Sequence, residues 1–188
     1  MIEHEVKKIV AKSTLQKYKK ILDGLTASKK SLQVNYYFDT PNFMLYTFGR
    51  TLRVRQKESE LVLQYKYDKH YTGKERICRE YERKLECFPE SIFSDQLPDG
   101  EAQFPAVFNY VGCLVTERID YLFDDAKVSL DMNFYLGEFD CEVELEFQEY
   151  GRADTLLDLL CFGSDEMPVI GKYDRFVGAV NGGGTNGG

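Results

Sequence analysis

The chain has 188 residues, a length that suits one domain, and 43% of them are hydrophobic, which supplies enough apolar surface for a core. The net charge of −7 excludes a general nucleic-acid-binding surface, which must be basic, although a basic pocket can lie inside an acidic protein. No apolar segment approaches the roughly 20 residues that cross a bilayer, and the N-terminus lacks a secretion signal, so we expect a cytoplasmic protein without membrane contacts.

The first predicted element is a strand over residues 2–10, because charged and apolar residues alternate there. One face of this strand carries three charged side chains, Glu3, Glu5 and Lys7. A helix is expected from about Thr14 to Leu25, with Ser13 as its N-cap. A second strand over residues 33–39 ends at a turn that contains Pro41.

The next two strands form a predicted hairpin over residues 51–57 and 60–68. Arg53 and Arg55 lie on one face of its first strand, and Lys66 lies on the polar face of its second strand. Neither arginine has an acidic neighbour on the same face of its own strand. The hairpin therefore concentrates positive charge on one side of the sheet.

The middle of the chain is predicted to be less regular. It contains, in order, a polar loop, a strand, a proline-containing linker with a short helix, and a further short helix: residues 68–76, 77–85, 86–106, 90–96 and 104–112. The strand carries Glu80 and Glu82 on one face. This region thus supplies acidic side chains from a single strand.

Strands return in the C-terminal half, over residues 115–123, 127–132 and 139–147. Their polar faces carry Arg118, Asp131 and an acidic run, Glu142, Glu144 and Glu146. A helix over residues 152–162 and a segment that contains Lys172 complete a single domain over residues 1–180. The glycine-rich tail, residues 181–188, is expected to be flexible.

The charges are separated by sign from strand to strand. Side chains two residues apart on a strand lie roughly 7 Å apart on one face, so Arg53 and Arg55 repel each other, as do the glutamates of the acidic run. A closed barrel explains this arrangement, because basic and acidic walls can then face each other around a ligand. An ordinary antiparallel sheet with solvated charged faces is the simpler alternative, and this pattern leaves it open.

The two walls indicate the ligand. A basic wall of Lys7, Arg53, Arg55, Lys66 and Arg118 suits a polyanion, since arginine binds phosphate through two parallel hydrogen bonds. An acidic wall would repel the same polyanion unless a hard divalent cation such as Mg²⁺ or Mn²⁺ lay between them. The sequence lacks a glycine-rich phosphate loop, its two histidines do not support a histidine-based triad, and its five cysteines show no zinc or disulfide pattern.

The pattern Glu3-x-Glu5-x-Lys7 resembles the ExExK signature of the CYTH domain, or triphosphate tunnel metalloenzyme, family. Further segments resemble the family's later strands in the same order: residues 36–41, the Leu-Arg-Val-Arg of residues 52–55, Lys66, residues 79–82, residues 142–146 and Lys172. The resemblance implies an α+β, mostly β fold, in which eight antiparallel strands close into a barrel, or tunnel, with flanking helices. It also implies hydrolysis of a triphosphate with Mg²⁺ or Mn²⁺.

The resemblance also implies roles for individual residues. The metal ligands would be Glu3, Glu5, Glu144 and Glu146, and the phosphate-binding residues would be Lys7, Arg53, Arg55, Lys66, Arg118 and Lys172. The secondary acids, which orient bases or water on the metal, would be Glu80, Glu82 and Asp131, and catalysis would depend on these three with Glu3, Glu5 and Lys7. The family often has a lysine two residues before the arginine that corresponds to Arg118, but here that position is Thr116, so one phosphate contact is in doubt.

Three functions fit these residues. The first is a metal-dependent phosphohydrolase for inorganic triphosphate or a related organic triphosphate, a small-molecule partner. The second is an adenylyl cyclase that converts ATP to cyclic AMP, and the third is a polyphosphate-binding module without catalysis. The sequence does not name the substrate or the preferred metal, and it leaves the oligomeric state open, with a homodimer as one candidate.

Overall fold

The computed structural model describes residues 2–72, 75–98, 104–147, 154–162 and 170–182, and at positions 2, 3, 71, 72 and 75 it describes the backbone alone. Within these ranges there are nine strands, β1 (Ile2–Val10), β2 (Ser28–Asp39), β3 (Thr51–Lys57), β4 (Glu60–Thr72), β5 (Glu75–Leu85), β6 (Ser91–Phe93), β7 (Val107–Leu122), β8 (Ala126–Tyr135) and β9 (Glu138–Phe147). The helices are α1 (Lys12–Asp23), α2 (Met44–Thr47), α3 (Asp154–Leu159) and α4 (Lys172–Gly182), with a 3₁₀ turn at Ser94–Gln96.

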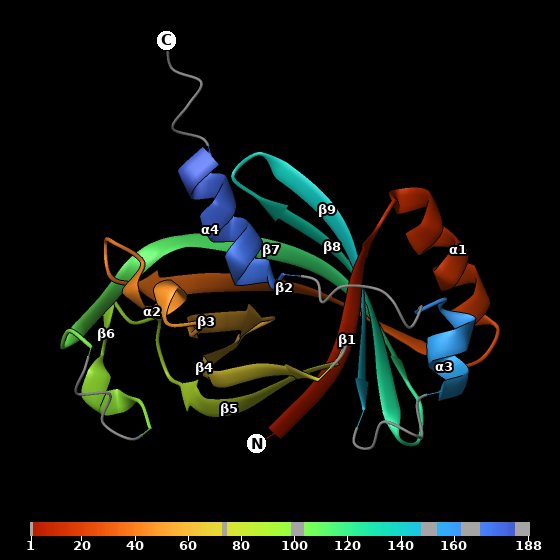
Figure 1. Cartoon of the computed structure of the whole chain (residues 1–188), viewed down its shortest axis with the longest axis horizontal. Coiled ribbons are helices and arrows are strands. Elements are labelled where there is room, and N and C mark those ends of the chain that lie inside the picture. Colours follow the sequence, from red (N-terminus) through yellow and green to blue (C-terminus); the bar gives the residue numbers. More distant parts are fainter. Residues whose placement is uncertain (1, 73–74, 99–103, 148–153, 163–169, 183–188) are drawn as a thin grey trace, which may run out of the picture.

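Eight of the strands form a closed antiparallel barrel (Figure 1). They follow one another in the order β2-β3-β4-β5-β1-β9-β8-β7, and a long pairing between β2 and β7 closes the ring. The short strand β6 pairs with β7 outside the barrel. The predicted α+β, mostly β fold with eight antiparallel strands around a tunnel is therefore confirmed.

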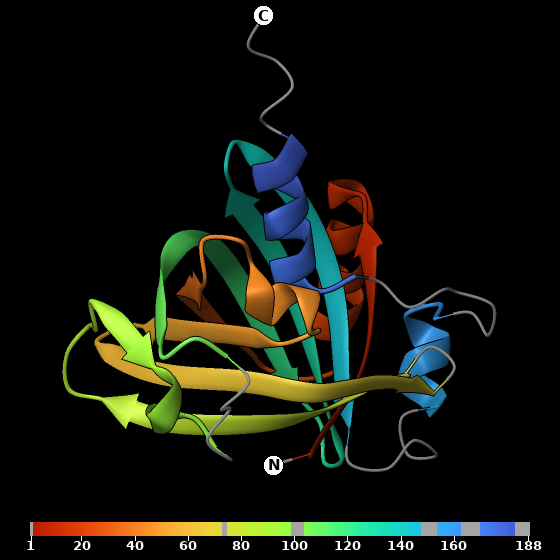
Figure 2. The same cartoon turned by 60° about the vertical axis from the view of Figure 1, so that its left-hand side comes forward.

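The apolar faces of the strands point outward and are covered by helices and loops. On one side, Val143 and Leu145 of β9 pack with Leu15 and Leu22 of α1 and with Leu157 of α3. Figures 1 and 2 show both helices on this side of the barrel, next to β1. Because the apolar side chains are used on the outside, the alternating polar side chains are left to fill the inside.

A second apolar cluster covers β3 and β4 on the opposite side, where Leu52 and Leu63 pack against Ile92 of β6 and Phe108 of β7. A third cluster places α4 against the barrel, since Tyr173 and Phe176 pack on Tyr37 and Leu114. Together the three clusters hold a polar tunnel in a fixed shape. No helix in the described ranges is long and apolar enough to cross a membrane.

Gly112 makes the contact between α4 and β7 possible. It lies at a bulge in the pairing of β7 with β2, and its φ of 144° is in the region that favours glycine. A Cβ atom at this position would lie 2.4 Å from Cζ of Phe176. The absence of a side chain at Gly112 therefore lets α4 approach the barrel closely.

Several predicted elements are wrong in detail. The N-cap of α1 is Ala11, not Ser13, and it makes no side-chain cap hydrogen bond. Residues 104–112 do not form a helix, because β7 begins at Val107 and pairs with β2 along its length. Residues 90–96 form β6 and a 3₁₀ turn.

The predicted loop over residues 68–76 is also wrong, because β4 and β5 extend to Thr72 and from Glu75. The segment that contains Lys172 forms a helix, α4, which includes Asn181 and Gly182. The rest of the predicted tail, residues 183–188, lies outside the described ranges, as does the start of the helix predicted over residues 152–162, whose described part, α3, ends at Leu159. The errors at residues 68–76, 90–96 and 104–112 share a cause, since strand pairing with other parts of the chain overrides local signals.

Candidate active site: a charged tunnel

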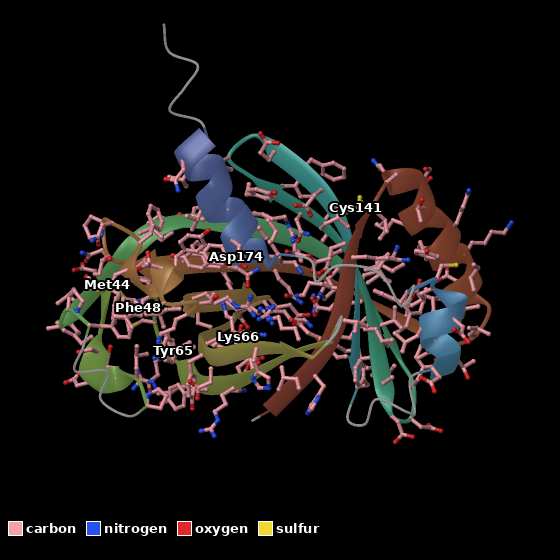
Figure 3. The ribbon with its side chains drawn as sticks, viewed as in Figure 1. Met44, Phe48, Tyr65, Lys66, Cys141 and Asp174 are labelled. Carbon is pink, nitrogen blue, oxygen red and sulfur yellow. The ribbon has the colours of Figure 1, made fainter. Side chains whose placement is uncertain are left out.

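A cavity of about 650 Å³ lies inside the barrel. Of the predicted site residues whose side chains are described, Asp131 alone does not line this cavity; the others are Glu5, Lys7, Arg53, Arg55, Lys66, Glu80, Glu82, Arg118, Glu144, Glu146 and Lys172. In Figure 3, Lys66 lies inside the barrel among nitrogen-bearing side chains, and Asp174 lies above it at the start of α4. Closure of the barrel thus brings together these charges from six strands and a helix.

Glu3 is the remaining predicted residue. Its backbone lies on β1 opposite Cys78 of β5, and its side chain lies outside the described part of the structure. Strand alternation places it on the same face as Glu5. Its role as a metal ligand stays a prediction.

Arg53 and Arg55 are the basic side chains without an acidic partner. The Nε atom of Arg53 donates to Oε1 of Gln64 at 2.8 Å, and that of Arg55 donates to Oδ1 of Asn35 at 3.0 Å. No carboxylate of the described residues forms an ion pair with either guanidinium. Burial, with repulsion from Arg53 and Arg118, lowers the pKa of Arg55 to about 10. These two arginines thus present positive charge to the cavity without an ion-pair partner among the described residues.

Glu80 and Glu82 on β5 support this basic side. Glu82 accepts a short hydrogen bond from Gln64, which in turn orients Arg53. Glu80 lies 3.6 Å from Nζ of Lys66. The two glutamates thus contact side chains of β4 from the neighbouring strand, and their role as acids that orient bases stays a prediction.

The opposite side of the tunnel is mixed in charge. Lys7 lies 2.9 Å from Glu5 on its own strand and 3.6 Å from Glu144 on β9. Glu5 also forms an ion pair with Arg76 at 2.6 Å. We expected Lys7 to face the acidic wall from the basic side, and this was wrong, because Lys7 lies within the acidic wall.

Asp131 lies behind the wall and holds two cations in place. Arg118 donates to both of its carboxylate oxygens, at 2.7 and 2.6 Å, and Nζ of Lys172 lies 2.8 Å away. Burial acts to raise the pKa of Asp131, but Arg118 and Lys172 outweigh it and lower that pKa. Asp131 therefore remains ionised and fixes the two cations at the tunnel surface.

Glu142 and Glu144 extend this network. The fully buried Glu142 accepts from Lys172 and, at 2.7 Å, from Arg175. Glu144 lies 3.4 Å from Arg118 and 3.5 Å from Lys172. Although burial opposes ionisation, Lys172, Arg118 and Lys7 lower the pKa of Glu144 well below its usual range.

The carboxylates form two candidate metal sites. Oxygen atoms of Asp131, Glu142 and Glu144 all lie within 4.8 Å of one another, a spacing that suits a cation. However, Arg118, Lys172 and Arg175 already neutralise Asp131 and Glu142, so an ion among these three would have to displace a buried cation.

The second candidate site lies between β1 and β9. Glu5 and Glu146 are direct partners across these strands, and Glu144 lies two residues before Glu146 on the same face of β9. Burial and the negative charge of Glu144 raise the pKa of Glu146 to about 7. These carboxylates are also paired with cations, Glu146 with Lys127 at 2.6 Å, but unlike Asp131 and Glu142 they line the cavity, where an ion can reach their oxygen atoms. Carboxylate oxygens are the ligands that Mg²⁺ and Mn²⁺ prefer, so these residues fit such an ion.

A model of the CYTH domain family matches residues 1–158. The chain belongs to the CYTH domain family. The match includes the strands that carry the tunnel residues from Glu5 to Glu146, whereas Lys172 lies beyond it on α4. No curated protein matches the chain.

Solved structures also resemble this CYTH domain. A putative adenylate cyclase from Bacillus halodurans is 25% identical, with 92% of this chain and 95% of that chain covered and a TM-score of 0.71. A putative adenylyl cyclase from Hippeastrum, described as having a dominant triphosphatase activity, is 22% identical, with 94% and 95% covered and a TM-score of 0.74. The Mimivirus capping enzyme triphosphatase is 10% identical, with 86% and 89% covered and a TM-score of 0.57. The last two likenesses concern the fold.

The position at which the family often has a lysine is occupied by the neutral side chain of Thr116, which is part of a hydrogen-bond network. The hydroxyl of Thr116 is buried and donates to Asn133 at 2.8 Å, and Asn133 donates to Asp140. Asp140 in turn accepts from Arg175 at 2.9 Å. Thr116 does not line the cavity, so this CYTH domain has one fewer cation at that point of the tunnel wall.

Several residues that line the tunnel were not predicted as site residues, among them Arg76, Lys69 and Tyr37. Arg76 and Lys69 belong to the segment that was interpreted as a loop, so their orientation could not be inferred. Tyr37 was predicted to lie on a strand, but its inward orientation was missed. Because it lies two residues after the polar Asn35, strand alternation could have placed both side chains on the inner face. The Tyr37 hydroxyl is fully buried and has no hydrogen-bond partner among the described residues.

Proposed function

We propose that this CYTH-domain protein is a divalent-metal-dependent phosphohydrolase that acts on inorganic triphosphate or a related organic triphosphate inside the tunnel. The observation that carries the proposal is the pair Arg53, which is buried, and Arg55, which is half-buried, on one face of β3 without a carboxylate ion-pair partner among the described residues. Such an arrangement costs free energy in the empty protein, and a bound polyanion would offset that cost. The cavity of about 650 Å³ also suits a small ligand.

The basic side chains would hold the phosphates in a fixed order. Arg53 is oriented by Gln64, and Arg55 is oriented by Asn35, so their remaining N–H groups are available for phosphate oxygens. Lys66 on β4 and Lys172 on α4 would contact the phosphate groups of the ligand. Glu80 holds Lys66 in position, and Asp131 holds Lys172. Positioning of this kind, with charge stabilisation, is the main contribution of protein to phosphoryl transfer.

The acidic side would hold the metal. Glu5, Glu144 and Glu146, together with Glu3, are the residues that we assign to Mg²⁺ or Mn²⁺. When bound, the ion would neutralise phosphate charge and act as a Lewis acid on a phosphoryl oxygen. Lys7, which lies beside Glu5 and Glu144, would keep the acidic residues apart from the anionic ligand and bind a phosphate at the boundary.

The activity reported for the Hippeastrum structure supports a triphosphatase rather than a cyclase. A cyclase is the second candidate, because the Bacillus halodurans structure at 25% identity is described as a putative adenylate cyclase. A cyclase must also recognise adenine. The tunnel lining is dominated by charged side chains, which supports a ligand that consists mainly of phosphate.

The test is hydrolysis by purified protein of tripolyphosphate, thiamine triphosphate, ATP and longer polyphosphate, each with Mg²⁺ and with Mn²⁺. We expect metal-dependent phosphate release from tripolyphosphate or an organic triphosphate. Glu144→Gln should reduce the rate on the order of 100-fold or more, because it removes a charge from the metal wall. Glu138→Gln, on an exposed site of the same strand, is the matched control and should retain full activity.

Three results would contradict the proposal in different ways. Cyclic AMP formed from ATP and Mn²⁺, without phosphate release, would indicate a cyclase. Binding of tripolyphosphate without turnover would indicate a binding module. No change in melting temperature on addition of tripolyphosphate and metal would indicate that the tunnel does not bind polyphosphate at all, since a ligand of the native state must stabilise it.

A further inference from the structure

Lys69 points into the tunnel because of an irregularity in β4. In a regular strand, alternate residues share a face, so Lys66 and Lys69 should lie on opposite faces. The register between β4 and β5 shifts between Tyr67 and His70, and Asp68 adopts a φ of 50°. This bulge changes the alternation, so that Lys66 and Lys69 both line the cavity while Asp68 and His70 are exposed.

Lys69 has no carboxylate partner among the described residues. Its Nζ atom donates to Oγ1 of the buried Thr51 at 2.7 Å, which is a neutral acceptor. The other basic side chains near it are already paired, since Arg76 lies 2.6 Å from Glu5 and Lys66 lies 3.6 Å from Glu80. Lys69 is therefore the amine on this part of the wall that an anion could engage without breaking an ion pair.

The charges around Lys69 come from three elements. Lys66 on its own strand and Arg76 on β5 disfavour its protonated form, whereas Asp174 at the start of α4 and Cys78 on β5 favour it. Asp174 is also used by the backbone, because it accepts a hydrogen bond from the N–H of Gly171 at 2.8 Å. With burial as the largest cause, followed by Arg76, the pKa of Lys69 is lowered to about 7.

We propose that Lys69 binds a phosphate oxygen of the polyphosphate and takes up one proton from solvent as it does so. This inference rests on the proposed function, because it requires a polyanion in the tunnel. A bound phosphate supplies the negative charge that Lys69 lacks, and an opposite charge within a few ångströms favours the ammonium form. Only a proton moves in this step, and no covalent bond to the phosphate forms or breaks.

A dependence of affinity on pH follows. Below pH 7, Lys69 is already charged in the free protein, so binding costs no protonation. As the pH rises above 7, the protein must gain a proton to bind, and the contribution of Lys69 falls about tenfold per pH unit until its pKa in the complex is reached. The affinity of the wild type relative to a variant without the amine should therefore decrease over this range.

The experiment is calorimetric titration of the full chain with tripolyphosphate, in a chelator that prevents turnover. Measurement at pH 8 in buffers with different ionisation enthalpies gives the number of protons taken up. We expect the wild type to take up roughly 0.4 to 0.8 of a proton more per ligand than Lys69→Met, because a 10- to 100-fold effect on affinity corresponds to a rise of about one to two units in the pKa of Lys69. Lys69→Met should bind on the order of 10- to 100-fold more weakly at pH 6, with the difference nearly gone at pH 9.

Two variants separate this role from a structural one. Lys69→Arg keeps a permanent charge, so it should bind at pH 9 as tightly as at pH 6 relative to Lys69→Met, without the extra proton. Lys84→Met removes a lysine that is 79% exposed outside the tunnel on β5, and it should behave as the wild type. If Lys69→Met does not fold, the difference in proton uptake between the wild type and Lys69→Arg still tests the inference.

Equal proton uptake by the wild type, Lys69→Arg and Lys69→Met would overturn the inference and leave the proposed function intact. Absence of tripolyphosphate binding in the wild type would also overturn it. Hydrolysis with Mg²⁺ or Mn²⁺ would then decide separately whether the proposed function fails as well.

Discussion

Arg118 and Asp131 form two hydrogen bonds, at 2.7 and 2.6 Å, across the paired strands β7 and β8, and both side chains are buried. Because Asp131 also holds Lys172, its single carboxylate offsets two cations. The pair explains how the barrel keeps positive charge at the tunnel surface. Arg118 still lines the cavity, whereas Asp131 lies behind it.

Asp131→Asn should destabilise the protein by about 3–5 kcal/mol, because it removes a buried charge that both Arg118 and Lys172 contact closely and leaves them only their pairs with Glu142 and Glu144. Urea denaturation measures this loss. Tripolyphosphate should raise the melting temperature of this variant more than that of the wild type, since it supplies the missing negative charge. Glu60→Gln, at an exposed ion pair with Lys84, is the control and should change stability little; a similar loss in both variants would contradict the prediction.

Arg55→Met should weaken tripolyphosphate binding about 10- to 100-fold, which corresponds to the loss of a charged hydrogen bond. The same variant should melt at a higher temperature than the wild type when no ligand is present. The pKa of Arg55 is lowered by burial and by Arg53, so its charge costs stability in the folded state at neutral pH. Calorimetric titration and thermal unfolding measure the two effects, and a lower melting temperature would show that Arg55 is compensated within the protein.

Tyr37→Phe removes a hydroxyl that lacks a partner among the described residues, so the stability of the free protein should not fall. Burial raises the pKa of Tyr37, and the nearby Arg53 and Lys172 oppose that rise, so the hydroxyl lies close to the predicted phosphate site. If it donates to the ligand, kcat/KM should fall about 10-fold or more.

Tyr173→Phe is the matched comparison for Tyr37→Phe. The Tyr173 hydroxyl donates to the buried Asp39 at 2.7 Å, so its removal should destabilise the protein by about 1–3 kcal/mol. Loss of stability in Tyr37→Phe to the same extent would mean that its hydroxyl is satisfied in the native protein. Unchanged kinetics would mean that it does not contact the substrate.

The stability of the metal-free protein should include a pH-dependent contribution from Glu146. Burial and Glu144 raise its pKa from 4.5 to about 7, so the folded state binds more protons than the unfolded state between these values. This contribution is present below pH 4.5 and is lost as the pH rises through 7. Melting curves of the wild type and Glu146→Gln should therefore diverge with rising pH, with the variant more stable at pH 8.

Addition of Mg²⁺ or Mn²⁺ should stabilise the wild type more at pH 8 than at pH 5.5, because the ion competes with a proton for Glu146. Glu146→Gln should lose most of this difference. Equal stabilisation of the two proteins by the metal would show that Glu146 is not a ligand. A pH-independent difference in melting temperature between them would show that its pKa is not raised.

The sequence alone determined which segments alternate and which charged residues share a face. From this, the barrel class and most of the tunnel lining could be predicted, because strand alternation is a local property with a period of two residues. Arg53, Arg55, Glu80 and Glu82 were placed correctly inside the barrel for this reason. The family pattern added the order of the strands.

Only the tertiary structure decided how these charges are paired. Lys7 lies beside Glu5 and Glu144, and Asp131 lies behind Arg118, because the register between neighbouring strands fixes these distances. The bulge in β4 reverses the alternation and brings Lys69 into the tunnel, which no count of residues along the strand could predict. Register, bulges and closure depend on contacts between segments far apart in the chain, and these contacts set which charges remain free for a ligand.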